Sequence, residues 1–192
     1  MPSPSKKGQI NEIIKCGKDP VYFMNRYLFI QHPLRGLIPF KTYDFQDECV
    51  DHFNSHRFNI ILKSRQLGLS TLVAAYAVWQ AIFYKEKNIL IIATKLAVAQ
   101  NFIRKVKTYI KSMPSWLLVP TIVANNKQQV EFSNGSQIKA VPTSEDAGRS
   151  EALSLLIVDE AAFVRNFDDL WMGLYPTLST GGRAILLSTP NG

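Results

Sequence analysis

The sequence has few of the features that mark secreted or membrane proteins. Its 192 residues include only two cysteines, Cys16 and Cys49, so a disulfide scaffold is not expected. No apolar run reaches the roughly 18 to 20 residues that a membrane helix needs. The N-terminus, MPSPSKKG, lacks the apolar stretch of a signal peptide. These absences predict a cytoplasmic protein that makes no contact with a membrane.

Acidic residues are also scarce relative to basic ones. There are 15 Asp and Glu against 22 Lys and Arg, which gives a net charge of +7. Such an excess favours a polyanionic partner, nucleic acid first. Charge alone leaves a basic protein without such a partner equally open.

The chain divides by composition into three expected segments: a disordered tail (1–8), a helical segment with a linker (9–39) and a main domain (40–192). Apolar positions at helical spacing predict helices at 9–30, broken at 17–20 by Gly and Pro. Two prolines make 32–40 an extended linker.

In the main domain, apolar strands alternate with helices. Strands are predicted at 59–62, 88–93, 153–158 and 184–187, and helices at 43–55, 70–84 and 97–112. The alternation predicts an α/β fold with a mainly parallel sheet, and the first strand's continuous apolar character predicts burial at the sheet's centre. An Asn-Gly pair predicts a hairpin within 121–141. Ligands bind such sheets at the carboxyl ends of the strands.

The stretch KSRQLGLST, at 63–71, lies at such a strand end. It resembles the phosphate-loop pattern G-x-x-x-x-G-K-[ST], with Gly68 as the second glycine and Ser70 as the hydroxyl. Leu69 occupies the usual lysine position, and Lys63 occupies that of the first glycine. Lys63 could fold back across the loop, with Arg65 as a second cation. Taken alone, the stretch is a weak signal and favours a plain strand-to-helix turn with two exposed cations.

An acidic pair follows the third apolar strand, in LLIVDEAAF. There Asp159 can hold Mg²⁺ and Glu160 can polarise an attacking water. The alternative is a helix N-terminus, where acids are favoured by the helix dipole. A phosphate loop followed by this pair is a much more specific combination than either motif alone.

Two further polar segments flank these motifs. Gln46, in FKTYDFQDE, offers the donor and acceptor that an adenine edge requires, although it could be an exposed helix residue. Ser188-Thr189-Pro190-Asn191 ends the last strand. Its small polar groups could sense a terminal phosphate, or the segment could be a simple turn.

Together, in this order, the motifs resemble the N-terminal ATPase domain of the large terminase subunit of tailed bacteriophages, a DNA-packaging motor. The resemblance covers about 40–192 and rests on TYDFQ (Q motif), KSRQLGLST (Walker A), IIATKLAVAQ, VEFSNGSQIKAVPTSEDAGRS (hairpin and arginine loop), IVDEAAF (Walker B) and STPNG (coupling motif). It implies an ASCE/RecA-like P-loop NTPase fold, a three-layer α/β sandwich with an additional strand. Because the chain stops at the coupling motif, we expect a truncated domain without the family's nuclease domain.

The resemblance also implies roles for individual residues. Mg-ATP would be bound by Gln46 and by the loop residues Lys63, Ser64, Arg65, Gln66, Leu67, Gly68, Leu69, Ser70 and Thr71. Mg²⁺ would be held by Ser70 and Asp159. Catalysis would involve Glu160, Lys63, Arg65 and, as an arginine finger, Arg149; coupling would involve Ser188, Thr189 and Asn191. Leu69 departs from the many relatives that keep a lysine there, which implies less efficient hydrolysis but not a loss of nucleotide binding.

The implied function is ATP hydrolysis coupled to translocation of double-stranded DNA into a viral procapsid in the host cytoplasm. The implied partners are DNA, the portal protein, the small terminase subunit and a ring of identical subunits. Alternatives are a superfamily 2-like helicase or other DNA translocase, a nucleotide-binding module without efficient hydrolysis, and a DNA-binding adaptor with a vestigial loop. The basic helix could contact DNA phosphates, or its face could simply be solvated; its basic residues are Lys95, Arg104, Lys105, Lys107 and Lys111.

Overall fold

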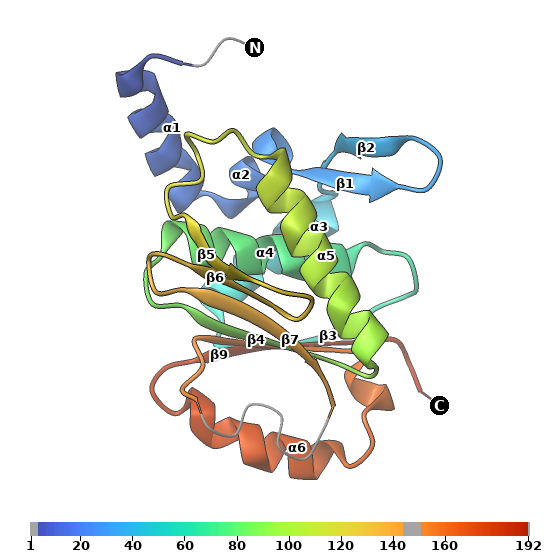
Figure 1. The fold of residues 1–192 in the computed structure, drawn as a ribbon. Helices are drawn as coiled ribbons and strands as arrows, with labels where there is room; N and C mark the ends of the chain where they lie inside the picture. The colour runs from blue at the N-terminus through green and yellow to red at the C-terminus, as the bar shows by residue number, and fades with distance from the viewer. Residues whose placement is uncertain (1–3, 144–150, 192) are drawn as a thin grey trace.

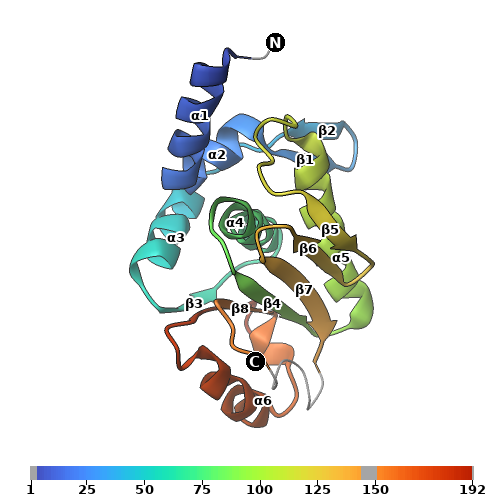
Figure 2. The ribbon, with the colours of Figure 1, turned by 60° about the vertical axis from the view of Figure 1, so that its left-hand side comes forward.

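The computed structural model describes residues 4–143 and 151–191 and has three layers (Figure 1). A seven-stranded sheet lies between a layer of helices that includes α4 and α5 and a smaller layer formed by α6, as the turned view also shows (Figure 2). The helical elements are α1 (Lys6–Lys18), α2 (Pro20–Tyr27), α3 (Asp44–Ser55), α4 (Leu69–Phe83), α5 (Leu96–Ser112), η1 (Ala161–Phe163), α6 (Phe167–Leu174) and η2 (Tyr175–Leu178). The predicted three-layer α/β sandwich is confirmed.

The sheet is mainly parallel, as predicted. Its strands are β3 (Phe58–Leu62), β4 (Asn88–Ala93), β5 (Ile122–Asn125), β6 (Gln129–Phe132), β7 (Gln137–Pro142), β8 (Leu155–Asp159) and β9 (Arg183–Ser188). Their order is β3-β9-β8-β4-β7-β6-β5, with β6 and β5 antiparallel to their neighbours. β9 lies between β3 and β8, and is therefore the additional strand that the resemblance implied. The carboxyl ends of β3, β8 and β9 meet at one edge.

The core lies on both faces of the sheet because the buried strands alternate their side chains. Along β4, Ile89 and Ile91 pack towards the helices around α4, whereas Leu90 and Ile92 pack towards α6. Most residues of α4 are buried, since the helix packs against the sheet below it and helices α2, α3 and α5 around it. This double coverage explains the continuous apolar runs of β4 and β8.

One strand is placed differently from the prediction. β3 was expected to be buried at the centre of the sheet, but among the described strands it lies at the edge and pairs with β9 alone. Ile60 is 82% exposed and Leu62 is 74% exposed. The apolar run thus predicted the strand correctly and its burial wrongly. The residues of a strand do not determine whether it lies at the centre or the edge of the sheet.

The N-terminal segment is more regular than predicted. Helix α1 begins at Lys6, within the expected disordered tail, and Ser5 caps it by accepting a hydrogen bond from the Gly8 N–H (3.3 Å). The predicted break at 17–20 is confirmed, with Asp19 capping α2. The expected extended linker at 32–40 is instead largely a hairpin of β1 (Phe29–His32) and β2 (Gly36–Pro39). Its turn is closed by the His32 imidazole, which accepts from two backbone N–H groups.

The hairpin expected around the Asn-Gly pair is confirmed as β6 and β7, with β5 adding a third strand. Helix α6 was not predicted from the sequence. Among the described residues, no helix is both long enough and apolar enough to cross a bilayer.

Candidate functional site

The loop between β3 and α4 forms a small cavity at the carboxyl edge of the sheet. The cavity measures about 200 Å³ and is lined by Lys63, Ser64, Gln66, Leu67, Gly68, Leu69, Ser70, Thr71 and Lys105. Helix α4 begins at Leu69, so its first N–H groups, which have no partner within the helix, lie at this loop. Such a helix N-terminus is an anion-binding arrangement.

Gly68 is required by the geometry of this loop. Its φ of +72° lies in the left-handed region, which side chains other than glycine rarely adopt. A Cβ atom there would also lie 2.9 Å from Nε2 of Gln46. The glycine therefore allows the loop to pass close to α3.

Gln46 is buried, at 2% exposure, which rules out the exposed helix glutamine considered from the sequence. Its Nε2 donates to the Leu67 carbonyl (2.8 Å), and its Oε1 accepts from the Tyr43 N–H (3.2 Å). In this structure the amide therefore ties α3 to the phosphate loop. The adenine contact that the resemblance implies stays a prediction.

Lys63 reaches along the sheet edge to the acidic pair, whereas the sequence suggested that it could fold back across the loop. Its side chain is 7% exposed, and its ammonium donates to Oε1 of Glu160 at 2.6 Å. Oδ1 of Asp159 lies 3.8 Å from the same ammonium. Since β9 separates β3 from β8, the lysine side chain passes the end of β9 to connect the first motif with the acidic pair.

Ser70 and Asp159 lie together, although 89 residues separate them in the chain. The Ser70 hydroxyl donates to both carboxylate oxygens, at 3.2 and 3.0 Å. Burial raises the pKa of Asp159 above its ordinary value, against the opposing effects of Lys63 and the Ser70 hydrogen bond. A hydroxyl beside a poorly solvated carboxylate supplies the hard oxygen ligands that Mg²⁺ prefers, so these residues fit the cation predicted for them.

Glu160 stands in the left-handed region, with a φ of 55°. Its Oε2 accepts from both the N–H and the hydroxyl of Thr189, each at 3.0 Å. Burial pushes its pKa upwards, but the hydrogen bonds from Lys63 and Thr189 together outweigh burial and hold the pKa below that of an ordinary glutamate. Glu160 is therefore a carboxylate at neutral pH.

The three predicted coupling residues all contact the segment that follows β8. Besides the Thr189 bonds to Glu160, the Ser188 hydroxyl accepts from the Ala162 N–H at 3.0 Å. The side-chain amide of Asn191 donates to the Ala162 carbonyl at 2.9 Å. The end of β9 is thus hydrogen-bonded to the acidic motif, and the coupling role of these residues stays a prediction.

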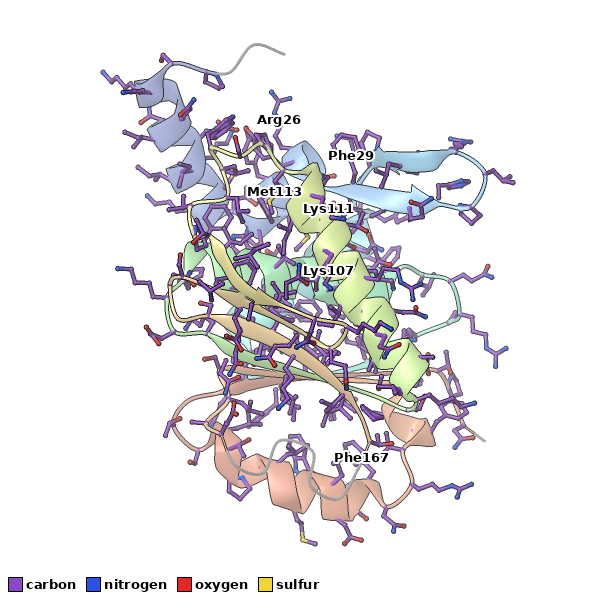
Figure 3. The ribbon with its side chains drawn as sticks, viewed as in Figure 1. Arg26, Phe29, Lys107, Lys111, Met113 and Phe167 are labelled. Atoms are coloured by element: carbon purple, nitrogen blue, oxygen red, sulfur yellow. The ribbon has the colours of Figure 1, made fainter. Side chains whose placement is uncertain are left out.

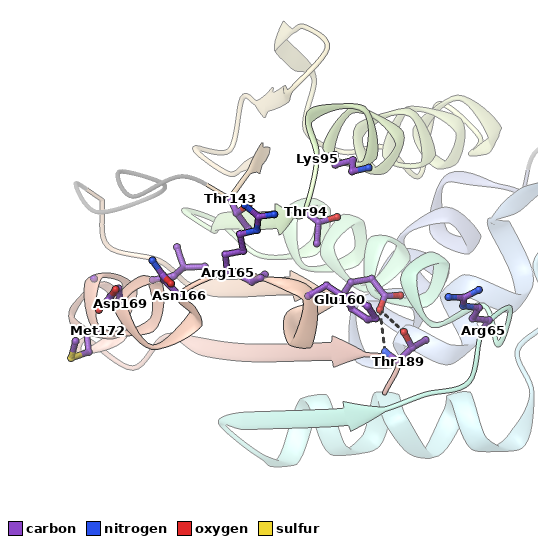
Figure 4. Close-up of a pocket in the computed structure, with 14 residues that line it drawn as sticks. Arg65, Thr94, Lys95, Thr143, Glu160, Arg165, Asn166, Asp169, Met172 and Thr189 are labelled. Carbon is purple, nitrogen blue, oxygen red and sulfur yellow. Dashed lines mark hydrogen bonds between the residues drawn. The ribbon is translucent and has the colours of Figure 1, made fainter. Parts of the chain in front are cut away.

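A second, larger cavity of about 1230 Å³ lies beside Glu160 (Figure 4). Arg65 lines this cavity rather than the phosphate-loop cavity, together with Lys95 and Arg165. Arg165 was missed in the sequence, where nothing distinguished it from other surface cations. Arg149, the predicted arginine finger, lies outside the described residues.

The basic residues of α5 do not form one face. Arg104 and Lys111 are exposed. The Lys107 ammonium donates to the Asn126 carbonyl at 2.7 Å. Figure 3 labels Lys107 and Lys111 along α5. Lys105 instead lines the phosphate-loop cavity. Lys105 therefore differs in its surroundings from Arg104 and Lys111, and contact of this helix with DNA stays a prediction.

Comparison with known proteins places this arrangement in a family. The N-terminal family model of the terminase large subunit, T4-like virus type, matches residues 60–192. That range includes the phosphate loop, the acidic pair and the end of β9.

Solved structures match the fold. The HK97 bacteriophage large terminase superposes with a TM-score of 0.71 at 16% sequence identity. The match covers 90% of this chain and 37% of the HK97 chain. The Thermus phage P74-26 large terminase ATPase domain gives 0.67 at 20% identity, covering 80% and 66%. A large terminase of a thermophilic bacteriophage in complex with ATP-gamma-S gives 0.55 at 13% identity, covering 77% and 38%. The chain thus spans little more than a third of the HK97 protein.

Proposed function

The chain belongs to the terminase large-subunit family, and from this we propose that it is an ATPase motor domain that drives double-stranded DNA into a viral procapsid. The observation that carries the proposal is the chain of contacts from Lys63 to Glu160 and from Asp159 to Ser70 at one sheet edge. It unites a phosphate-loop cation, a candidate base and candidate metal ligands. The matching terminase structure that contains ATP-gamma-S supports nucleotide as the ligand.

The residues fit Mg-ATP as follows. The phosphates would be held by the N–H groups at the start of α4 and by Lys63, and the magnesium by Ser70 and Asp159. When bound, magnesium neutralises charge on the phosphate oxygens. The Leu67 carbonyl, held by Gln46, keeps the loop in shape for this binding.

Glu160 would act as the base that orients water. Its ionised carboxylate accepts hydrogen bonds, and Thr189 fixes one of its two oxygens. In the present structure the other oxygen is paired with Lys63. We propose that Lys63 moves to the phosphates when nucleotide binds, which releases that oxygen to accept a proton from water.

The remaining roles extend the proposal to the assembled motor. Ser188, Thr189 and Asn191 would transmit the state of Glu160 to β9 and onwards to DNA. Arg149 would act as an arginine finger, and Arg65 would contact phosphate or report nucleotide state. The net charge of +7 suits a DNA partner. Portal protein, small terminase subunit and a ring of identical subunits in the host cytoplasm are the partners and setting we propose.

The test is Mg²⁺-dependent ATP turnover, measured with and without double-stranded DNA, for the wild type and Glu160→Gln. The proposal expects turnover in the wild type and its loss in the variant, with ATP still bound by both. ATP binding without wild-type turnover would favour a nucleotide-binding module that does not hydrolyse, as Leu69 in place of lysine allows. DNA binding without nucleotide binding would favour the adaptor, and strand separation of a duplex would favour the helicase.

A further inference from the structure

The phosphate-loop cavity includes one residue from outside the loop and its helix. Lys105, on α5, lines it together with residues of 63–71. One turn later on the same helix, the buried Tyr109 hydroxyl donates to the Thr71 carbonyl at 3.0 Å. This bond fixes α5 against the start of α4, so the position of Lys105 relative to the loop is also fixed.

The loop itself presents little positive charge to this cavity. Leu69 stands where a lysine is usual, and at 3% exposure its side chain packs in the core. Arg65 lines the larger cavity instead. Lys63 remains, and its ammonium is already paired with Glu160. A nucleoside triphosphate carries several negative charges, and phosphate sites compensate them with charge-assisted hydrogen bonds.

Lys105 is a cation at this cavity that has no anionic partner among the described residues. Its ammonium lies over the Phe102 ring, 5.3 Å from the ring centre, which is a cation–π contact and not an ion pair. Among the residues that the structure describes, it forms no ion pair. Burial lowers the pKa of Lys105, with Asp159 opposing this effect and Lys63 adding to it. A partly buried cation without a paired anion is destabilising, and a bound phosphate would relieve that cost.

We propose that Lys105 is a second phosphate-binding cation, which contacts the phosphate chain of a nucleoside di- or triphosphate from the side of α5. It supplies charge that the loop lost at Leu69, while Lys63 serves the edge nearest Glu160. The proposal rests on the nucleotide site of the proposed function. It separates Lys105 from Arg104 and Lys111, whose exposed side chains stay available to other partners.

The experiment measures equilibrium affinities of the whole chain for Mg-ATP, Mg-ADP and AMP, without DNA. Lys105→Met keeps an unbranched apolar side chain and removes the charge, and Lys105→Gln is a second neutral variant. Lys105→Arg restores the charge. Lys127→Gln removes the same charge at an exposed turn and is the matched control. Thermal unfolding without nucleotide shows which variants are folded.

We expect both neutral variants to bind ATP and ADP about 10- to 100-fold more weakly, the effect of losing a hydrogen bond from a charged group. The affinity for AMP, which lacks the outer phosphates, should fall much less, and Lys105→Arg should recover most of the affinity for ATP and ADP. Wild-type affinity in a folded neutral variant would overturn the role of Lys105 and leave the ATP site standing. Equal losses for ATP and AMP, not restored by arginine, would assign Lys105 a structural role instead. Absence of binding by the wild type would defeat the proposed function itself.

Discussion

The ammonium of Lys63 lies 2.6 Å from the Glu160 carboxylate, so the cation of the first motif and the acid of the second neutralise each other. Both groups would be needed by a bound nucleotide, one for its phosphates and the other for water. The ion pair between Lys63 and Glu160 compensates both charges. This matters because the side chains of Lys63 and the neighbouring Asp159 are almost inaccessible to solvent. A phosphate that attracts Lys63 would therefore also release Glu160.

The first prediction concerns Lys63 itself. Lys63→Met should weaken Mg-ATP binding by about 10- to 100-fold, because a charged hydrogen-bond donor to phosphate is lost. It should also lower the unfolding temperature without nucleotide, since Asp159 and Glu160 lose their shared cation. Calorimetric titration and thermal unfolding measure the two effects. Lys63→Arg, which keeps the charge, is the control, and unchanged ATP affinity in Lys63→Met would rule Lys63 out as the phosphate cation.

The second prediction concerns the contact between Gly68 and Gln46. Gly68→Ala should cost about 1 to 3 kcal/mol of unfolding free energy from its left-handed backbone, plus the displacement of the Gln46 amide. Gly36→Ala is a matched control, because its φ is +70° but nothing lies within 4 Å of the added Cβ. Denaturant unfolding of both variants isolates the contact. Equal losses in the two would show that the Gln46 amide yields without cost.

Local motifs were predictable because each depends on a few neighbouring residues. The phosphate loop, the acidic pair and the end of β9 could be recognised from their strand-then-polar pattern, and parallel strands bring their carboxyl ends to one edge. Gln46 was singled out for an adenine contact, which stays a prediction. Its bond to the Leu67 carbonyl joins segments that are 21 residues apart and could not be foreseen.

Strand order and helix facing were harder to predict. Ile60 and Leu62 read as buried residues because nothing within β3 shows that it lies at an edge. Lys105 did carry a usable signal. It lies three residues after Phe102 and four before Tyr109, both of which are buried, and so it shares their side of α5. Considering the five basic residues together, as a helix that could contact DNA or be solvated, did not separate Lys105 from the others.

The third prediction concerns pH and the N-terminal helices. Glu12 accepts hydrogen bonds from the Tyr22 and Tyr27 hydroxyls at 2.6 and 2.7 Å. The hydrogen bond from Tyr22 is the main cause that lowers the pKa of Glu12. A carboxyl whose pKa is lowered in the folded state stabilises the fold above its unfolded pKa. That contribution disappears as the pH falls through the folded pKa. Wild type should therefore be more stable than Glu12→Gln at neutral pH.

The advantage should shrink once the pH falls below the ordinary glutamate value of 4.5. Urea unfolding of both proteins at a series of pH values checks this. A stability difference that stays constant down to strongly acidic pH would show that Glu12 acts through packing rather than charge.

The fourth prediction tests whether Thr189 tunes Glu160. Thr189→Val keeps the side-chain shape and the backbone N–H but removes the hydroxyl that donates to Oε2 of Glu160 at 3.0 Å. With one donor fewer, the pKa of Glu160 should rise towards that of an ordinary glutamate, because its charged form is less stabilised. The acid limb of the ATPase pH profile should move to higher pH, while ATP affinity changes little, since Thr189 does not line the phosphate-loop cavity.

Thr108→Val is the matched control, because the Thr108 hydroxyl also makes a 3.0 Å hydrogen bond, to the Arg104 carbonyl on α5. Its pH profile should coincide with that of the wild type. If Thr189→Val slowed turnover equally at every pH, the hydroxyl would position the coupling segment without affecting the charge of Glu160. If its acid limb moved to lower pH, Glu160 would not be the group whose ionisation limits hydrolysis, since loss of a donor can only make that carboxylate easier to protonate.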